Sequence, residues 1–219
     1  MPEPTSPTGY RFWHGAQKWA LPLEIRASRK GSHEYGPGLY LTTSLDTAKH
    51  YAKGPGSLVE MELDLGVRWL EDATLAWGKV QDFLESRSGL RHRAQLLADL
   101  QRYMDRRGIP DHPEARLPAP VLVNLCVNHE VLTANHGPAL AAFLVSQGID
   151  ASRAYDKVNE SWVVVFNPAI IRQQIPRRVA DVDPFASFPT LPEQQAQLQA
   201  EARSPEPEPA AARSRARLR

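Results

Sequence analysis

The pattern of apolar and polar residues in this chain of 219 residues changes its period from place to place. Between Leu58 and Leu65 apolar residues alternate with acidic ones, which is typical of a strand with one buried face. Trp162–Phe166 is a continuous apolar run, which predicts a strand that is buried on both faces. Four shorter stretches also have the composition of strands: Tyr10–His14, Leu39–Thr43, Ile149–Tyr155 and Ile170–Ile175.

A helical period appears directly after the predicted strand Leu39–Thr43 and again in the middle of the chain. Ser44 is placed as a helix N-cap, where a hydroxyl accepts a hydrogen bond from a first-turn amide. The predicted helix runs to Lys53 and is ended by Gly54–Gly56. Its apolar residues recur at helical spacing on one face: Leu45, Ala48, Tyr51 and Ala52. Four longer segments are also predicted to be helical: Ala73–Arg87, Gly89–Arg107, Val121–Leu132 and Pro138–Gln147.

These elements predict an α+β fold in which a helical insertion, at about residues 73–147, separates the early strands from the late ones. Residues 1–9 form a flexible leader in this interpretation, and residues 10–180 form one folded domain with a sizeable core. From residue 181 prolines, alanines, glutamines and charged residues dominate. We therefore expect residues 181–219 to be a low-complexity, disordered tail, and we expect deletion from about residue 185 to leave the fold intact.

Composition limits the class of protein more than it identifies one. The net charge of +1 gives no argument for binding to nucleic acid or to a membrane surface. No apolar run approaches the ~20 residues of a membrane helix, and the polar, proline-rich Met1–Thr8 is unlike a secretory signal. Cys126 is the single cysteine, which fits a reducing compartment. We expect a cytoplasmic protein without a membrane partner, and the seven histidines lack the spacing of a metal site.

Three short motifs carry side chains that are capable of chemistry. The first aromatic strand ends in His14 and Gly15, and a glycine-hinged turn, Gly36–Gly38, leads into a strand that contains Tyr40. Glu160 directly precedes the strand of the continuous apolar run. Each motif alone has an ordinary structural explanation, as a core histidine, a turn or the start of a strand. A histidine, a tyrosine and a carboxylate on three strands form a cleft if those strands are neighbours.

Together the three motifs resemble those of the ADP-ribosyltransferase superfamily, in the branch with a His-Tyr-Glu triad that includes diphtheria toxin and the poly(ADP-ribose) polymerases. There the first strand carries a His-Gly, as Trp13–Gly15 does here. The second carries a Gly-x-Gly-(Ile/Leu)-Tyr run, like Gly36–Tyr40, and a late strand is similar to Asn159–Asn167. The resemblance covers about residues 10–65 and 150–175. It implies a split antiparallel or mixed sheet as the core of a catalytic domain.

The substrate that this resemblance implies is NAD. The bond between nicotinamide and ribose breaks through an oxocarbenium-like transition state, which needs a carboxylate near the developing positive charge. The resemblance assigns that role to Glu160, which also binds the 2′-hydroxyl of the nicotinamide ribose. It assigns the ribose of the adenosine side to His14 and the carboxamide to the backbone of Gly15. Tyr40 and Tyr51 are expected to flank the nicotinamide ring.

One position departs from the pattern of the superfamily. Many members carry a serine or threonine hydroxyl on the helix after the second strand, where it reaches the carboxamide. The register of this chain puts Ala48 there, and we expect the adjacent Thr47 to point elsewhere. Either Gly15 alone binds the carboxamide, or the hydroxyl of Thr43 or Ser44 takes that role.

These features predict an enzyme that moves ADP-ribose from NAD to a macromolecule and releases nicotinamide, by analogy as a bacterial toxin or defence effector. A toxin of this kind implies an inhibitory partner. Arg26 lies where many members place a basic residue near the adenosine half of NAD. The alternatives are an NAD glycohydrolase, which uses water as acceptor, and a catalytically silent module that binds a nucleotide or a partner. The acceptor stays open between protein, DNA and RNA. Many arginine-modifying members carry a second glutamate at the position of Val158, which argues against arginine.

Overall fold

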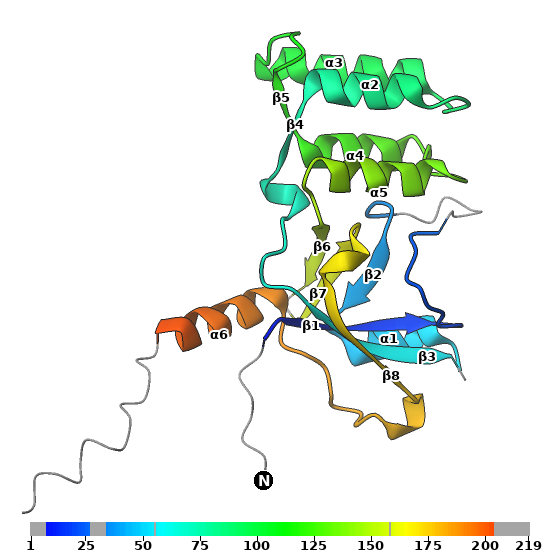
Figure 1. Ribbon diagram of the computed structural model, residues 1–219, viewed down its shortest axis with the longest axis vertical. Helices are drawn as coiled ribbons and strands as arrows, with labels where there is room; N and C mark the ends of the chain where they lie inside the picture. Colours follow the sequence, from blue (N-terminus) through cyan, green and yellow to red (C-terminus); the bar gives the residue numbers. More distant parts are fainter. Residues whose placement is uncertain (1–7, 27–33, 55, 158, 204–219) are drawn as a thin grey trace, which may run out of the picture.

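The structure is a computed structural model that describes residues 8–26, 34–54, 56–157 and 159–203. The described chain has a mixed α+β fold arranged in tiers (Figure 1). A six-stranded antiparallel sheet forms the base. Two pairs of helices lie in successive layers above it, so the predicted helical insertion is a separate tier of the molecule (Figure 1).

The sheet takes its strands from both ends of the sequence, in the order β6-β7-β2-β1-β3-β8. Every neighbouring pair is antiparallel. All six strands predicted from the sequence are present, and the last of them lies at an edge of the sheet. The strands are β1 (Tyr10–Ala16), β2 (Leu39–Thr42), β3 (Ser57–Leu63), β6 (Ala151–Lys157), β7 (Glu160–Val165) and β8 (Ile171–Arg177).

Strands β1 and β2 are paired over a much shorter length than their neighbours. Their backbone register is limited to Trp13 opposite Thr42, whereas β1 pairs with β3 along all seven of its residues. Away from this pair the two strands separate, and Figure 1 shows β2 turned from β1 toward the helices. The sheet therefore opens at this place. The strands that carry His14, Tyr40 and Glu160 are consecutive neighbours, β1, β2 and β7, as the cleft requires.

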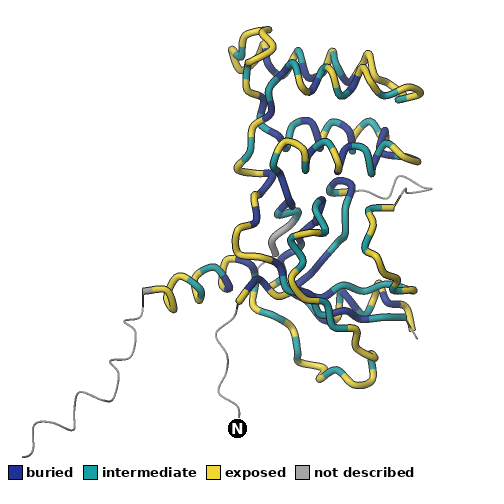
Figure 2. The backbone as a smooth tube through the Cα atoms, in the orientation of Figure 1, coloured by how far each residue is buried: buried dark blue, intermediate teal, exposed yellow. Residues whose placement is uncertain are grey.

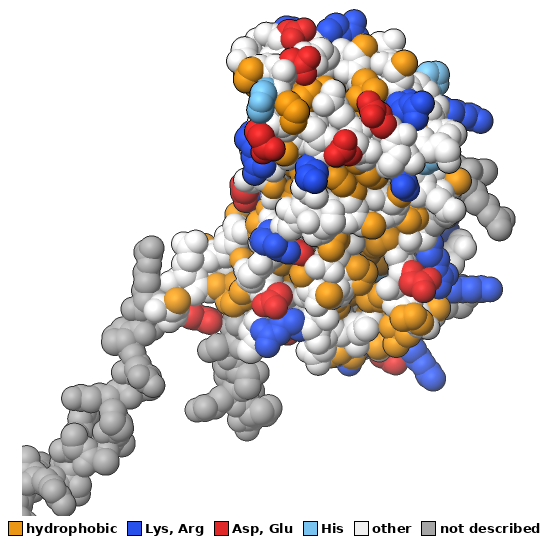
Figure 3. Space-filling model, turned by 45° about the horizontal axis from the view of Figure 1, so that its top comes forward, with side chains coloured by type: hydrophobic (Ala, Val, Ile, Leu, Met, Phe, Trp, Pro, Cys, Tyr) orange, Lys and Arg blue, Asp and Glu red, His pale blue; other side chains and the backbone are white. Residues whose placement is uncertain are grey.

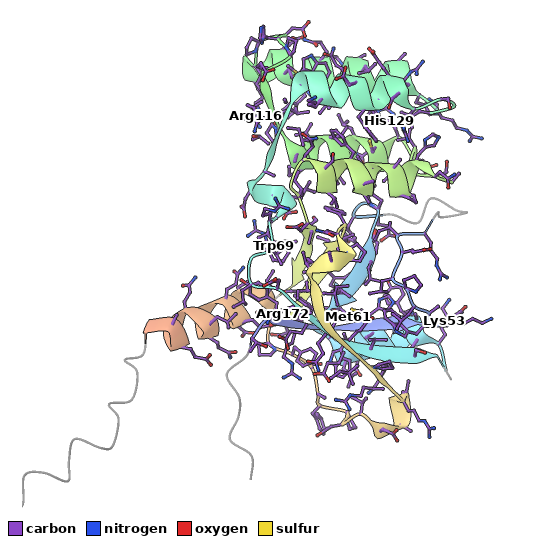
Figure 4. All side chains as sticks on the ribbon, viewed as in Figure 1. Lys53, Met61, Trp69, Arg116, His129 and Arg172 are labelled. Carbon is purple, nitrogen blue, oxygen red and sulfur yellow. The ribbon has the colours of Figure 1, made fainter. Side chains whose placement is uncertain are left out.

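The two faces of the sheet are buried by different parts of the chain. On one face β1, β3 and β7 contribute a cluster that includes the fully buried Phe12, Met61 and Val163 (Figure 4 labels Met61). On the other face helix α1 (Leu45–Ala52) packs against Trp13. The alternation along β3 that predicted a half-buried strand is confirmed, because its apolar side chains are buried and its two glutamates are not.

Helix α1 begins and ends as the sequence predicts. The Ser44 side chain accepts a hydrogen bond from the Thr47 amide at 3.2 Å, so the predicted N-cap is confirmed. Lys53, in the left-handed conformation, ends the helix. Three members of the predicted apolar face, Leu45, Ala48 and Ala52, are buried, whereas the fourth, Tyr51, is 49% exposed.

The helical tiers have an apolar core of their own. Helices α4 (Ala119–Asn128) and α5 (His136–Ser146) lie next to the sheet, and α2 (Trp77–Ser86) and α3 (Arg93–Arg107) lie beyond them (Figure 1). Their buried side chains form one cluster that continues to the end of β7 at Phe166. The tube in Figure 2 shows buried residues along the inner sides of both layers. On the face that Figure 3 shows, acidic and basic side chains are interspersed over this region.

A second, small sheet of two strands lies in the helical region and was not predicted. The predicted helix Ala73–Arg87 is wrong over its first residues, where β4 (Thr74–Ala76) forms a strand instead. Its partner β5 (Arg116–Pro118) lies between the predicted helices Gly89–Arg107 and Val121–Leu132. The strand ends at Ala76, and helix α2 begins at Trp77, whose indole donates to the Asp111 carboxylate at 2.9 Å.

The predicted disordered tail is wrong over residues 181–203. The chain continues from β8 through a short 3-10 helix, Val179–Asp181, to helix α6 (Leu191–Arg203). Leu191 is buried in the cluster on the first face of the sheet, and Phe188 stacks on Trp13. A few well-placed side chains therefore anchor a segment whose overall composition is polar. The prediction for residues 204–219 and for the leader lies outside the described residues, apart from Thr8 and Gly9.

In the described part of the chain, none of the helices combines the length and the apolar character needed to cross a bilayer. Cys126 is buried in the helical core, and this burial raises the pKa of its thiol to about 12. A thiol held in its protonated form is unreactive, so Cys126 acts as a small apolar side chain of the core.

Candidate functional site

A cavity of about 350 Å³ opens where β1 and β2 separate. Its size lies within the range of small-molecule sites. The first turns of α1 close one side, and β2 and β7 form the opposite wall. The residues that line it come from the loop before β2 and from all these elements: His14, Gly15, Glu34, Gly38, Leu39, Tyr40, Leu41, Thr42, Thr47, Ala48, Tyr51 and Trp162. Four of the predicted site residues are in this set, namely His14, Gly15, Tyr40 and Tyr51.

His14 spans the gap between the two separating strands. Its Nδ1 lies 2.8 Å from the carbonyl oxygen of Tyr40, and because a carbonyl only accepts, Nδ1 carries the proton and donates. Burial lowers the pKa of His14 below its ordinary value, although the bond to the Tyr40 carbonyl acts in the opposite direction. The imidazole is therefore neutral near pH 7, with Nε2 as a hydrogen-bond acceptor. A ribose hydroxyl is a ligand that such a nitrogen can accept from.

Tyr40 is held by the turn that precedes its own strand. Its hydroxyl donates to the carbonyl of Gly36 at 2.8 Å and accepts from the amide of Tyr35 at 3.2 Å. Burial raises the pKa of this phenol to about 12, so it remains a neutral donor. Gly36 has φ +109°, a conformation that favours glycine. The hydroxyl of Tyr40 is thus bonded to two consecutive residues at the start of the turn, which fixes the ring at the cavity wall.

Glu160 lies at the start of β7, beside the cavity rather than in its lining. Two side chains that do line the cavity donate to its carboxylate. The Thr42 hydroxyl lies 2.7 Å and the Trp162 indole nitrogen 2.6 Å from the same oxygen, Oε1. No hydrogen-bond partner for the second oxygen, Oε2, is found among the described residues. One oxygen is therefore fixed by the protein, and the other is available to a ligand hydroxyl.

Aromatic rings surround this carboxylate. Trp162 is in edge contact with Tyr51, with ring centroids 5.8 Å apart and planes at 80°, and Tyr35 approaches Trp162 at 6.2 Å. The Tyr51 ring is half-exposed, and burial, with the negative charges of Glu34 and Glu160 nearby, raises the pKa of its phenol. Tyr40 and Tyr51 line the same cavity from β2 and α1. The arrangement offers a planar ligand apolar walls with a carboxylate beside them.

The structure shows why glycine occurs at the helix wall, and it corrects the expectation about the hydroxyl groups there. A Cβ placed on Gly15 lies 1.8 Å from the backbone oxygen of Ala48, so glycine is required there by the close packing of α1 on β1, whatever the cavity binds. Thr47, expected to point elsewhere, lines the cavity. The expected substitutes do not, because the Thr43 hydroxyl accepts from the Ser161 amide and the Ser44 hydroxyl caps α1. Thr47 is therefore the hydroxyl that α1 offers to a ligand.

Arg26 is not brought to the cavity. It is exposed, in a segment without regular structure between β1 and the undescribed residues 27–33, and it is absent from the cavity lining. Val158 also lies outside the described residues, so the argument about arginine as acceptor stays a prediction.

Three functional residues were missed by sequence reasoning. Thr42 and Trp162 hold the carboxylate of Glu160, and Glu34 lines the cavity. A signal for the first two was present in the sequence. Residues two apart on a strand share a face, so Trp162 lies on the same side of β7 as Glu160, and Thr42 lies on the same side of β2 as Tyr40.

The described residues contain no group of three or more histidine, cysteine, aspartate or glutamate side chains with the geometry of a metal site. Comparison of the whole chain with protein-family models, with curated proteins and with solved structures gave no match.

Proposed function

We propose that this chain transfers ADP-ribose from NAD to a macromolecular acceptor with release of nicotinamide, and that Glu160, His14 and Tyr40 carry the reaction. The observation that carries the proposal is the state of Glu160. Its Oε1 is held by Thr42 and Trp162, its Oε2 lacks a partner among the described residues, and it adjoins a cavity with aromatic walls. The opening of an antiparallel sheet between β1 and β2 further supports a split sheet of the ADP-ribosyltransferase kind.

The proposed reaction uses these groups as follows. The bond between the anomeric carbon of the ribose and the nicotinamide nitrogen breaks, and its electron pair leaves with nicotinamide as a neutral molecule. The negative charge of Glu160 stabilises the resulting oxocarbenium, and its Oε2 accepts a hydrogen bond from the 2′-hydroxyl of the nicotinamide ribose. Tyr40 and Tyr51 enclose the nicotinamide ring. The Nε2 atom of His14 accepts a hydrogen bond from a ribose hydroxyl of the adenosine half of NAD. The acceptor then attacks the anomeric carbon and loses a proton.

The proposal is tested with NAD that carries separate labels on the nicotinamide and on the adenosine. The purified chain is incubated with it in the presence of protein, DNA or RNA, and free nicotinamide and labelled macromolecule are both measured. Labelled macromolecule with stoichiometric nicotinamide supports the transferase and identifies the acceptor. Release of nicotinamide without labelled macromolecule would show that the chain is an NAD glycohydrolase and not a transferase. Binding of NAD without release of nicotinamide leaves only a silent binding module.

Replacement of Glu160 by glutamine tests whether the charge of this residue is needed for catalysis. Glutamine keeps the size of the side chain and an oxygen for Thr42 and Trp162, but it removes the charge. Loss of one such electrostatic contact lowers kcat by about 10²–10³-fold, and we expect NAD still to bind. Glu85, exposed on α2, gives a matched control, since Glu85→Gln should leave kcat unchanged. Turnover of Glu160→Gln within about threefold of the parent would remove Glu160 from the proposed role.

A further inference from the structure

The segment between β8 and α6 contacts residues that adjoin the proposed catalytic carboxylate in sequence. After the 3-10 helix Val179–Asp181 the chain passes below the sheet and returns to it at α6 (Figure 1). We call residues Ala186–Gln194 the strap. Phe188 packs with the cluster of α1 and Trp13 on one face of the sheet, whereas Leu191 is buried in the cluster of the other face. The strap therefore wraps around the end of the sheet where β2 stops and β7 starts.

Three hydrogen bonds join the strap to this end of the sheet. The amide of Phe188 donates to the carbonyl of Thr43 at 2.9 Å, and the amide of Leu191 donates to the Ser161 hydroxyl at 2.9 Å. The Ser187 hydroxyl accepts from the amide of Leu45, the first residue of α1, at 3.0 Å. These bonds tie the turn between β2 and α1, and the start of β7, to one external segment.

The residues that the strap holds are the direct neighbours of the site. Thr43 and Ser161 are fully buried and are bonded to each other twice, from the Thr43 amide to the Ser161 carbonyl at 3.0 Å and from the Ser161 amide to the Thr43 hydroxyl at 2.9 Å. Thr42 and Glu160 adjoin them in sequence and are bonded through Oε1. The strap is thus one residue away from both partners of that hydrogen bond.

Aromatic and amide contacts anchor the strap itself. The Phe188 ring stacks on Trp13 with centroids 5.1 Å apart, and the Arg11 guanidinium lies 4.6 Å from the same ring. The Trp13 indole donates to the Ala186 carbonyl at 2.8 Å. At the far end, the Gln194 amide accepts from the Arg11 amide at 2.7 Å and donates to its carbonyl at 3.0 Å. It pairs with β1 there as a neighbouring strand does, at a position where β2 has ended.

We propose that the strap positions Glu160, and that Phe188 and Ser187 are positioning residues of the proposed reaction. This inference rests on the proposed function, but its structural part is tested without activity. Loss of the strap releases the turn Thr42–Leu45 and the start of β7, so the carboxylate is no longer held against the cavity. Misplacement of a reacting group by about 1 Å costs on the order of 10²-fold in rate. NAD affinity should change little, since the strap is absent from the cavity lining.

The full chain offers a closely matched pair of variants. Phe188→Ala removes the ring that anchors the strap, and Phe185→Ala removes a ring of the same type three residues earlier that is 91% exposed. Phe188→Tyr keeps the stacking and should restore the parent behaviour. Ser187→Ala, which removes the acceptor for α1 and nothing else in the strap, serves as a second variant if Phe188→Ala does not fold.

The first measurement is hydrogen exchange of the peptides that contain Thr42–Leu45 and Glu160–Trp162. In Phe188→Ala we expect their amides to exchange about tenfold faster or more, because local opening no longer breaks the strap contacts. Peptides of α3 should be unchanged, and Phe185→Ala should match the parent throughout. Equal exchange in Phe188→Ala and Phe185→Ala overturns the strap as a positioning element, whether or not the chain cleaves NAD.

The second measurement is NAD cleavage, well below the melting temperature of every variant. For Phe188→Ala we expect kcat to fall about tenfold to a hundredfold, with KM within about threefold of the parent and recovery in Phe188→Tyr. A purely structural role would leave kcat of the folded protein unchanged, and that result overturns the positioning claim. If the parent releases no nicotinamide while exchange changes as expected, the proposed function fails and the strap remains a constraint on the geometry of the cavity.

Discussion

The helical tiers and the opened end of the sheet bury their side chains in different ways. Within residues 73–147 the described core consists of apolar side chains, the Cys126 thiol and the Trp77 indole, whose nitrogen donates to Asp111. All six buried polar side chains of the described residues lie outside this region, and each has a hydrogen-bond partner. They are Thr42, Thr43, Asp150, Ser152, Ser161 and Gln194. Four of the six belong to the network of the strap and Glu160.

This difference indicates what each region contributes. An apolar core is non-directional and tolerates exchange of its side chains when volume is kept. Buried hydrogen bonds are directional, and each one left unpaired costs free energy, so they define one arrangement of the groups they connect. The helical tiers therefore supply stability, while the buried polar network fixes the position of the carboxylate. Changes in the first region should be felt as stability, and changes in the second as altered chemistry or local geometry.

The largest effect is expected from truncation in the helical core. Leu100 is fully buried in α3, and Leu100→Ala should lower the free energy of unfolding by about 2–5 kcal/mol, through lost burial and the cavity that remains. The kcat of the folded fraction should stay that of the parent. Denaturant unfolding and NAD cleavage on the same sample check both statements. The exposed Gln95 on the same helix supplies the control, as Gln95→Ala should change neither. A parallel loss of kcat would contradict the separation of the two regions.

A smaller effect is expected where the polar network meets the cavity. Tyr40→Phe keeps the ring at the wall but removes the hydroxyl that donates to the carbonyl of the buried Gly36. An unpaired buried group of this kind costs about 1–3 kcal/mol of stability. Tyr51→Phe is the matched control, because its side chain is 49% exposed and should cost nothing measurable. NAD affinity, measured by titration calorimetry, should remain close to that of the parent in both, since a stacking face needs the ring and not the hydroxyl. Equal stability of the two variants would show that the Tyr40 hydroxyl is not part of the network.

Periodicity in the sequence predicted the sheet well, for a physical reason. The alternation along β3 indicates a strand with one buried face, and the apolar run of β7 indicates a strand with two buried faces. The pattern of burial along a strand follows from the strand geometry, so it can be recognised in the local sequence. The motifs around His14, Tyr40 and Glu160 indicated strands that had to be neighbours, and the topology makes them so. What the sequence does not encode locally is the pairing of distant segments. The short strand β4 depends on β5 for its hydrogen bonds, so composition at Thr74–Ala76 could not show it.

The strap is the clearest case of that limit. A polar segment with few large apolar residues has the composition of a disordered tail, and the average hides the single ring of Phe188 and the single buried Leu191. Phe188 anchors the segment because its ring stacks on Trp13 of β1. Leu191 anchors it because its amide donates to the Ser161 hydroxyl of β7. The exposure of Arg26 and the position of Thr47, rather than Thr43 or Ser44, in the cavity lining have the same origin, since each depends on where a backbone turns in space.

The smallest effect concerns pH and His14. Burial lowers the pKa of His14 in the folded chain, whereas the unfolded chain has the ordinary value of about 6.5. Below about pH 6.5 the unfolded state therefore binds a proton that the folded state does not, and protons favour unfolding. The stability contributed by neutral His14 is complete above about pH 6.5 and is lost as the pH falls toward the folded pKa. Because one proton is involved, the free energy of unfolding changes by at most about 1.4 kcal/mol per pH unit.

The variant His14→Asn tests this titration, because its side-chain amide can still donate to the Tyr40 carbonyl but does not take up a proton. The pH-dependent contribution of His14 should vanish in the variant, so the difference in unfolding free energy between parent and variant should shrink as the pH is lowered from 7.5 to 5. A difference between parent and His14→Asn that is constant with pH would show that His14 does not titrate differently in the folded chain, and the neutral acceptor assigned to Nε2 would lose its support.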